Sequence, residues 1–332
     1  YLEGKRILVT GAAGFIGGTF TYEVLKRGYK VHGIDNFSNS TRKNINLFHK
    51  EFLNNFTFSE LDLSLDIDEL QRIFKTFMPS LVIHFAGLKV VSESEEKPEI
   101  YWKNNVDSTA NILKCLDSET SLIFSSSASV YGDNPQQPVS ENSSLNPKSI
   151  YGKTKVASED LIREYSLTKD IKSICLRYFN PVGSHKDYKV VENYTNKPDN
   201  LMPRLIETVK NNTNSINVYG NDYSTEDGTG KRDFIHIQDL IDGHIEAMKK
   251  IKYLKNINYF NLGTGKPISV LELINTFNDV NHLNIKKNFV ERRKGDVEVC
   301  FADPAKAFEL LRWKAKLGLK EMCKDSWAAV QK

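Results

Sequence analysis

Short apolar runs rich in β-branched residues alternate with helix-length stretches through the first half of this 332-residue chain. Six such runs are strand candidates: Arg6–Thr10, Lys30–Ile34, Phe56–Leu61, Leu81–Phe85, Ser121–Ser125 and Ser173–Leu176. When strands alternate with helices at this spacing, neighbouring strands run parallel, since each helix carries the chain back to the edge of the sheet where the previous strand began. The pattern therefore predicts an α/β fold, a doubly wound parallel sheet with helices on both faces.

The second half of the chain has a different pattern. Two polar loops, Ser184–Asn200 and Gly220–Lys231, are longer than connections in a compact domain usually are, which favours segments that fold over a ligand. Shorter helices are expected over Gln238–Lys249, Val270–Phe277 and Pro304–Leu311. We therefore expect a first domain over residues 1–180 and a smaller C-terminal α/β lobe over 181–332, with an approximate boundary because elements of the two interleave.

Composition argues against several classes of function. The 45 basic and 42 acidic residues give a net charge of +3 and are spread along the chain, so the sequence has no basic stripe for nucleic acid. The cysteines, Cys115, Cys175, Cys300 and Cys323, lack the close spacing of a zinc or redox site. No apolar run approaches the roughly eighteen residues of a membrane span. We expect a soluble, cytoplasmic protein with no metal and no nucleic-acid or membrane partner.

Three glycines, Gly11, Gly14 and Gly17, follow the first strand and open the first helix with the spacing G-x-x-G-x-x-G. A side chain at such a turn would hold the backbone away from a pyrophosphate, whose charge the amide groups and the positive end of the helix dipole stabilise. Three glycines alone also fit an ordinary tight turn, but the strand-turn-helix context favours a dinucleotide site. The first domain is therefore predicted to be a Rossmann domain.

Two carboxylates follow the next strands. Asp35 ends the second strand, where it can accept hydrogen bonds from an adenosine ribose and repel a 2′-phosphate, which favours NAD over NADP. The alternative is a plain acidic turn residue. Asp62, after the third strand, could meet the adenine edge or could simply cap a helix.

Tyr151 and Lys155 stand four residues apart, on one face of a predicted helix. An ammonium near a phenol in a partly dry cleft can supply much of the roughly 4 kcal/mol that lowers the phenol pKa from about 10 to about 7. A phenol with such a pKa can take a proton from a hydroxyl group. The pair also occurs by chance on exposed helices, but here it follows the fifth strand, whose serine run reaches Ser127 and could relay that proton.

In this order, the glycine motif, the serine run and the Tyr151/Lys155 pair resemble the extended short-chain dehydrogenase/reductase family, and further segments resemble its UDP-galactose (UDP-glucose) 4-epimerases. These segments span essentially the whole chain: Phe85–Lys89, Arg177–Gly183, Asn200–Pro203, Tyr219–Tyr223, Thr225–Gly230, Arg232–His236 and Arg292–Asp296. The resemblance implies an isomerase that interconverts UDP-glucose and UDP-galactose through a 4-keto intermediate, with NAD as a bound catalytic cofactor. It also suggests a homodimer through helices near Pro98–Leu116 and Tyr151–Leu167.

The resemblance also implies roles for single residues. Tyr151 is the acid/base, Lys155 binds the nicotinamide ribose and lowers the pKa of Tyr151, and Ser127 contacts the sugar 4-hydroxyl. Further residues match cofactor-binding positions: Gly11, Gly14, Phe15, Ile16, Gly17, Asp35, Asn36, Phe37, Ser38, Asn39, Ser40, Asp62, Leu63, Phe85, Ala86, Gly87, Lys89, Asn104, Tyr178 and Phe179. Others match substrate-binding positions: Lys89, Ala128, Ser129, Asn180, Asn200, Leu201, Asn217, Val218, Tyr219, Arg232, Arg293, Asp296 and Cys300.

Cys300 departs from the pattern of the resembled family. Members restricted to UDP-glucose and UDP-galactose usually carry a bulky Tyr at this position, whereas relatives that accept N-acetylated sugars carry a small residue. The thiol therefore favours a second activity on UDP-GlcNAc and UDP-GalNAc. The alternative is that Cys300 merely fills an apolar gap.

Three other interpretations compete. His236 and Asp239 could suggest a catalytic dyad, but they match a structural H-x-x-D element of the resembled family, and His84 is expected to be structural as well. A sugar-nucleotide 4,6-dehydratase or decarboxylase would share the cofactor half, but a dehydratase needs a carboxylate where this chain has Ala128 and Ser129. A non-catalytic nucleotide-binding protein would not need Ser127, Tyr151 and Lys155 together.

Overall fold

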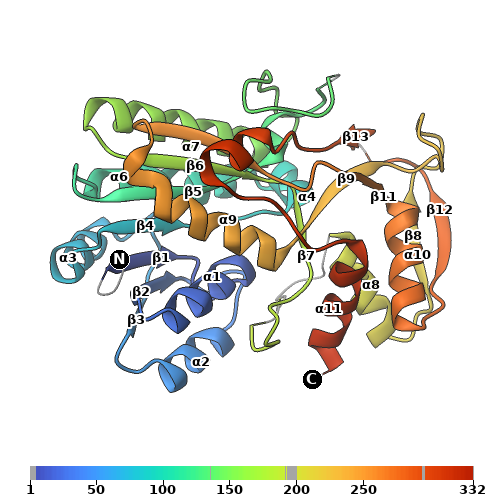
Figure 1. Cartoon of the computed structure of the whole chain (residues 1–332), viewed down its shortest axis with the longest axis horizontal. Coiled ribbons are helices and arrows are strands. Elements are labelled where there is room, and N and C mark those ends of the chain that lie inside the picture. The colour runs from blue at the N-terminus through green and yellow to red at the C-terminus, as the bar shows by residue number, and fades with distance from the viewer. Residues whose placement is uncertain (1–4, 135, 191, 193–199, 294–295, 332) are drawn as a thin grey trace.

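The computed structural model describes residues 5–134, 136–190, 192, 200–293 and 296–331 (Figure 1). Its main feature is a seven-stranded sheet of order β10-β6-β5-β4-β1-β2-β3, in which all neighbouring strands are parallel. The strands are β1 (Arg6–Thr10), β2 (Lys30–Asp35), β3 (Phe56–Glu60), β4 (Leu81–His84), β5 (Ser121–Ser127), β6 (Ser173–Tyr178) and β10 (Ile257–Leu262). The predicted doubly wound parallel sheet is confirmed.

Helices cover both faces of this sheet (Figure 1). Because neighbouring side chains of a strand point to opposite faces, Ile7 and Val9 of β1 enter one hydrophobic core and Leu8 enters the other. The first core is closed by α1 (Phe15–Lys26), α2 (Lys43–Glu51) and α9 (Ile237–Lys250). The second is closed by α3 (Ile67–Phe77), α6 (Ser108–Cys115) and α7 (Ile150–Thr168). The inner strands β1 and β4 are therefore largely apolar, whereas the edge strand β3 alternates apolar and polar residues.

The boundary near residue 180 is crossed by the sheet itself. Strand β10 and helix α9 lie well beyond residue 180, yet β10 pairs with β6 along its whole length and α9 packs on the first core. The two parts of the chain therefore interleave in the sheet, and the division into residues 1–180 and 181–332 stays a prediction.

A second, smaller lobe lies beside the carboxyl ends of the strands (Figure 1). It contains a four-stranded sheet, in which β9 pairs with β7, β11 and β13, and a parallel pair of β8 with β12. Its strands are β7 (Asn180–Val182), β8 (Ser215–Tyr219), β9 (Lys231–His236), β11 (Pro267–Ser269), β12 (Lys286–Val290) and β13 (Val299–Cys300). Its helices are α8 (Leu201–Lys210), α10 (Val270–Asn281) and α11 (Leu319–Gln331). A third hydrophobic core holds this lobe together.

Short helical segments complete the described structure: α4 (Val91–Glu96), α5 (Pro98–Tyr101), the π-helix η1 (Trp102–Asp107), and the 3₁₀ turns η2 (Ala128–Val130) and η3 (Ile251–Tyr253). The helix expected over Pro304–Leu311 is mainly a π-helix, η4 (Ala307–Leu311). Of the long loop Ser184–Asn200, residues 191 and 193–199 lie outside the described part of the chain.

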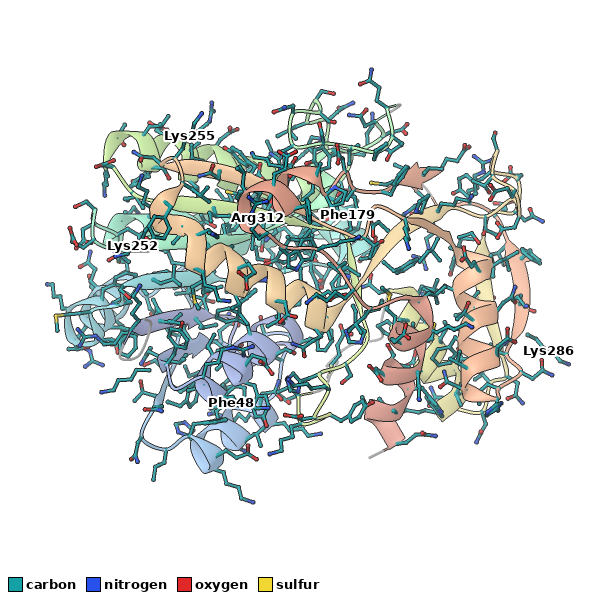
Figure 2. The ribbon with its side chains drawn as sticks, viewed as in Figure 1. Phe48, Phe179, Lys252, Lys255, Lys286 and Arg312 are labelled. Carbon is teal, nitrogen blue, oxygen red and sulfur yellow. The ribbon has the colours of Figure 1, made fainter. Side chains whose placement is uncertain are left out.

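Figure 2 places Phe179 in the middle of the molecule, where β6 leads into the second lobe, whereas Lys286 of β12 points outward at its far edge. Among the helices of the described ranges, none combines the length and the apolar character needed to cross a bilayer.

Candidate active site

The glycine turn lies where the strand order reverses, between β1 and β4. Gly11 has φ +69°, and a Cβ there would lie 2.8 Å from Ala86 N on the neighbouring strand end. A Cβ on Gly17 would lie 2.2 Å from Gly11 O. Helix α1 starts after Gly14 with no side-chain cap, so its first amide groups face the pocket and suit a pyrophosphate.

Asp35 has a part in building this turn. Its carboxylate accepts hydrogen bonds from Ala13 N at 3.0 Å, Phe37 N at 2.9 Å and Ser40 Oγ at 2.8 Å. Asn44 of α2 supports the same turn from behind by donating to Ala13 O at 3.0 Å. Asp35 lines the pocket, where a residue that binds the ribose is expected. Its carboxylate also accepts several hydrogen bonds within the protein, and one of them joins β2 to the glycine turn.

One pocket runs along the carboxyl ends of β1, β2 and β4. It brings together sixteen of the predicted cofactor residues: Gly11, Gly14, Phe15, Ile16, Gly17, Asp35, Asn36, Ser38, Asn39, Asp62, Leu63, Phe85, Ala86, Gly87, Lys89 and Asn104. Asn200, Pro203 and Glu192 from the second half also line it, so both halves of the chain form its wall. Lys89 forms an ion pair with Glu192 at 3.0 Å.

Ser127, Tyr151 and Lys155 meet at the carboxyl end of β5. Ser127 hydrogen-bonds the Tyr151 hydroxyl, and its Oγ also accepts from Ser129 Oγ at 2.8 Å. Lys155 Nζ lies 5.8 Å from the centre of the Tyr151 ring and donates to Ser125 O at 2.8 Å. The three predicted catalytic side chains are therefore adjacent.

Burial shifts the pKa values of both Tyr151 and Lys155. Burial raises the pKa of Tyr151, and the hydrogen bond with Ser127 only partly opposes this. Burial also lowers the pKa of Lys155 to about 8, although Glu159 counteracts it. Burial therefore acts on both groups of the pair, and the lowering of the Tyr151 pKa by Lys155 stays a prediction.

Sequence analysis missed how the first turn of α7 is held. Three successive amide groups there find side-chain acceptors: Ile150 N donates to Glu95 Oε1 at 2.7 Å, Tyr151 N to Ser94 Oγ at 3.1 Å and Gly152 N to Ser149 Oγ at 3.0 Å. Ser149 is a recognisable N-cap residue. Ser94 and Glu95 come from α4, more than fifty residues away in the sequence. No local sequence pattern predicts their contacts with α7.

The second lobe contributes a group of arginines. Arg293 stacks on the Tyr219 ring with its guanidinium carbon 4.0 Å from the ring centre, and Arg232 lies 3.6 Å from Asp296. Arg204, which sequence analysis did not select, donates to the Tyr219 hydroxyl at 3.3 Å. Such guanidinium groups can hold a diphosphate through paired hydrogen bonds.

The other predicted residues lie as follows. Ala128 and Ser129 form η2 directly after Ser127, Asn200 and Leu201 begin α8, and Asn217 and Val218 precede Tyr219 on β8. Asn180 is exposed at the start of β7. Tyr178 does not present its side chain to the pocket: it belongs to the first core, with its hydroxyl bonded to His244. Phe179 and Cys300 share a small apolar cluster with Tyr131.

The histidines singled out above are structural, as expected. The ring nitrogens of His84 lie 2.7 Å from Thr10 Oγ1 and 3.1 Å from Thr109 Oγ1. His236 accepts from Gln238 N at the start of α9, whereas the Asp239 carboxylate accepts from the amides of Lys316 and Leu317. His236 and Asp239 therefore do not form a dyad. Among the described residues, no cluster of three His, Cys, Asp or Glu side chains could hold a metal ion.

The chain matches a dehydratase family model and, among curated proteins, UDP-glucose 4-epimerases. A family model described as GDP-mannose 4,6 dehydratase matches residues 8–326. The UDP-glucose 4-epimerase of Bacillus subtilis is 40% identical over 324 residues, which cover 97% of this chain and 95% of that protein.

Solved structures agree. The UDP-glucose-4-epimerase from Stenotrophomonas maltophila, with bound NAD and formylated UDP-arabinopyranose, has a TM-score of 0.93 at 34% identity and 98% coverage of both chains. The UDP-Glc/GlcNAc 4-epimerase from Campylobacter jejuni has a TM-score of 0.85 at 32% identity and 99% coverage of both chains. By sequence and by structure, this chain belongs to the UDP-glucose 4-epimerase family.

Proposed function

We propose that this protein is an NAD-dependent 4-epimerase that interconverts UDP-glucose and UDP-galactose, with Tyr151 as the acid/base. The observation that carries the proposal is the contact between Ser127, Tyr151 and Lys155 at the end of β5, beside a pocket whose glycine turn suits a dinucleotide. NAD, when bound, supplies reversible hydride transfer at carbon 4, so that oxidation and reduction on opposite faces of the sugar leave no net redox change.

Side chains of the protein transfer the proton of the sugar 4-hydroxyl and bind the charged diphosphate. Tyr151 takes the proton of the sugar 4-hydroxyl through Ser127 and later returns it. Since burial raises the pKa of Tyr151, its ionised form depends on positive charge nearby, and Lys155 supplies such charge while it is protonated. Arg232 and Arg293 hold the diphosphate, while Asp296, Asn217 and Tyr219 face the nucleoside. The side chain of Val218 is buried in the third core.

The test compares wild type with Tyr151→Phe. Wild type should convert UDP-galactose to UDP-glucose, and Tyr151→Phe should lower kcat by about 10²- to 10⁴-fold because the proton acceptor is lost. NAD binding should persist in the variant, since the glycine turn is untouched. A Tyr151→Phe variant as fast as wild type would exclude the proposed mechanism.

We also propose that the enzyme accepts UDP-GlcNAc and UDP-GalNAc. Cys300 is nearly buried on β13, opposite Arg232 of β9, and its small side chain belongs to an apolar cluster with Phe179 and Tyr131. Wild type should epimerise UDP-GlcNAc, and Cys300→Tyr should lose this activity while keeping that on UDP-glucose. If wild type ignores the acetylated sugar, or if the Tyr variant still accepts it, Cys300 only fills an apolar gap.

The dehydratase described by the family model is a distinct candidate, because it shares the cofactor domain. Epimerisation is favoured because Ser127 is followed by Ala128 and Ser129, which offer no carboxylate to remove a proton from carbon 5. NMR of the product separates the two reactions, since dehydration loses water and epimerisation yields an isomer. A protein that bound NAD but converted no UDP-sugar would instead be a binding protein.

We also propose that the protein forms a homodimer and is located in the cytoplasm. The outer face of η1 and α7 exposes Trp102 by 40% and Leu167 by 63%, and a shallow hollow there is lined by Val106 and Leu161. Covering these apolar groups with a second copy would remove them from water. Light scattering of wild type and Leu167→Glu tests this: a monomeric wild type would contradict the dimer.

A further inference from the structure

A buried carboxylate continues the line of catalytic residues along α7. Tyr151, Lys155 and Glu159 are spaced by four residues, so all three side chains lie on the inner face of the helix. Glu159 is only 2% exposed. The mechanism above gives it no role, and a carboxylate seldom leaves water unless it is paired.

Glu159 is paired from two neighbouring strands. Arg177 of β6 forms a two-pronged contact, with Nε 3.0 Å from Glu159 Oε1 and Nη2 2.7 Å from Oε2. Ser126 of β5 donates to Oε1 at 2.6 Å. The carboxylate therefore joins α7 to β5 and β6 at the residue that directly precedes Ser127.

The arginine is itself tightly fixed. Its guanidinium carbon lies 5.1 Å from the centre of the Tyr131 ring and 4.8 Å from that of Tyr259, and its Nη1 donates to the Tyr131 hydroxyl at 3.0 Å. Tyr131 in turn donates to Asn261 Oδ1 of β10 at 2.6 Å. A buried ion pair of this kind is weak evidence for a role in stability, because removing two charges from water costs about as much as their attraction returns. Its position next to the catalytic residues is the more informative feature.

The surroundings of Lys155 show what Glu159 contributes. From β5, Lys155 meets the Phe124 ring and the Ser125 carbonyl, both uncharged. From β6 it faces Cys175, whose thiol stays protonated because burial raises its pKa.

Two titratable groups remain near Lys155. On β4, His84 stays neutral because burial lowers its pKa to about 3. On α7 itself, Tyr151 has a pKa raised by burial. Among the described groups that face Lys155, the negative charge at neutral pH therefore comes from Glu159, which favours the ammonium form.

We propose that Glu159 is a positioning residue of the epimerase, which ties the catalytic helix to the Ser126–Ser127 end of β5 and holds Lys155 in its charged form. The proposal rests on the proposed function of Tyr151 and Lys155. It predicts that activity fails at high pH when Lys155 loses its proton, and that Glu159 sets where this happens.

The experiment measures kcat for UDP-galactose against pH in NAD-loaded wild type, Glu159→Gln and Glu246→Gln. Glu159→Gln keeps the size and a hydrogen-bonding oxygen but removes the charge, so Lys155 should deprotonate at lower pH. We expect the alkaline limb to move down by about one pH unit, which lowers kcat about tenfold at a fixed pH on that limb. Glu246→Gln removes a carboxylate from a surface pair with Lys249 on α9 and should leave the limb in place.

A second variant covers the case in which Glu159→Gln does not fold because Arg177 is left unpaired. The double variant Glu159→Gln/Arg177→Gln leaves no charge of the pair behind. Since Glu159 is the carboxylate that favours the charged form of Lys155, its loss in the double variant should again move the alkaline limb down.

The outcomes separate the two proposals. If wild type itself does not epimerise UDP-galactose, the proposed function fails. If wild type is active and a folded Glu159 variant loses thermal stability while its alkaline limb stays where that of wild type lies, Glu159 is a structural residue and the present inference is wrong.

Discussion

Gly17→Ala tests whether the close packing of the glycine turn determines both stability and cofactor affinity. Gly17 lies inside α1, where alanine is normally favoured over glycine by about 1 kcal/mol. Here the added Cβ would lie 2.2 Å from Gly11 O, 2.9 Å from Gly11 C and 3.4 Å from Phe85 Cδ2. The two closest atoms belong to the backbone, so the turn itself must move.

The magnitude follows from this crowding. Overpacking of this kind costs about 1–3 kcal/mol, which outweighs the gain in helix propensity. Displacement of the amide groups that face the pyrophosphate should cost a similar amount in binding, which corresponds to about a 5- to 150-fold weaker affinity for NAD. Thermal unfolding measures the first effect, and calorimetric titration with NAD measures the second.

Gly28→Ala is the matched control. Gly28 follows the other end of α1 with φ +81° and no atom within 4 Å of an added Cβ. Alanine there should lower stability by about 1 kcal/mol through backbone strain alone and leave NAD affinity unchanged. A Gly17→Ala variant that is as stable as wild type and binds NAD equally well would refute the reasoning.

Three further predictions concern the support of the site. Burial opposes ionisation of Glu23, but hydrogen bonds from His185 and Arg27 outweigh this effect and lower the pKa of Glu23 to about 2. Ionised Glu23 therefore stabilises the fold above about pH 4.3, and this contribution is lost as the pH falls toward 2. In curves of stability against pH, Glu23→Gln should show a flatter acid limb than wild type. Asp233 is fully buried and accepts from Thr264 N, Gly265 N and Ala302 N. Asp233→Asn turns an amide donor toward these donors, which should lower the free energy of unfolding in chemical denaturation by about 2 kcal/mol. The variant should also raise KM for the UDP-sugar, because Arg232 is the neighbour of Asp233 on β9. Ser94→Ala removes the acceptor of Tyr151 N and should lower stability by about 1 kcal/mol. It should also reduce kcat and leave KM unchanged. An unchanged kcat would show that α4 does not position Tyr151.

Much of the architecture follows from local patterns in the sequence. Apolar and β-branched runs between helices predict six of the seven strands of the large sheet, because inner parallel strands such as β1 and β4 are covered on both faces and are largely apolar. The glycine spacing predicts the turn after β1, and the four-residue spacing of Tyr151 and Lys155 places both on one helix face. Strand β10 escaped prediction because Ile257–Leu262 contains two asparagines, which weaken the strand signal, and Asn261 acquires its role only through Tyr131 and Val139.

What the sequence alone could establish is the set of elements and the residue types that chemistry requires, because propensity, periodicity and the conformational freedom of glycine act over a few residues. The charge states and the support of the catalytic residues arise only in the folded chain. Burial decides the pKa of Tyr151, Glu159 meets Arg177 from another strand, and Asp35 bonds the glycine turn as well as facing the pocket. These properties depend on desolvation and on partners tens of residues away, which spacing along the chain does not encode.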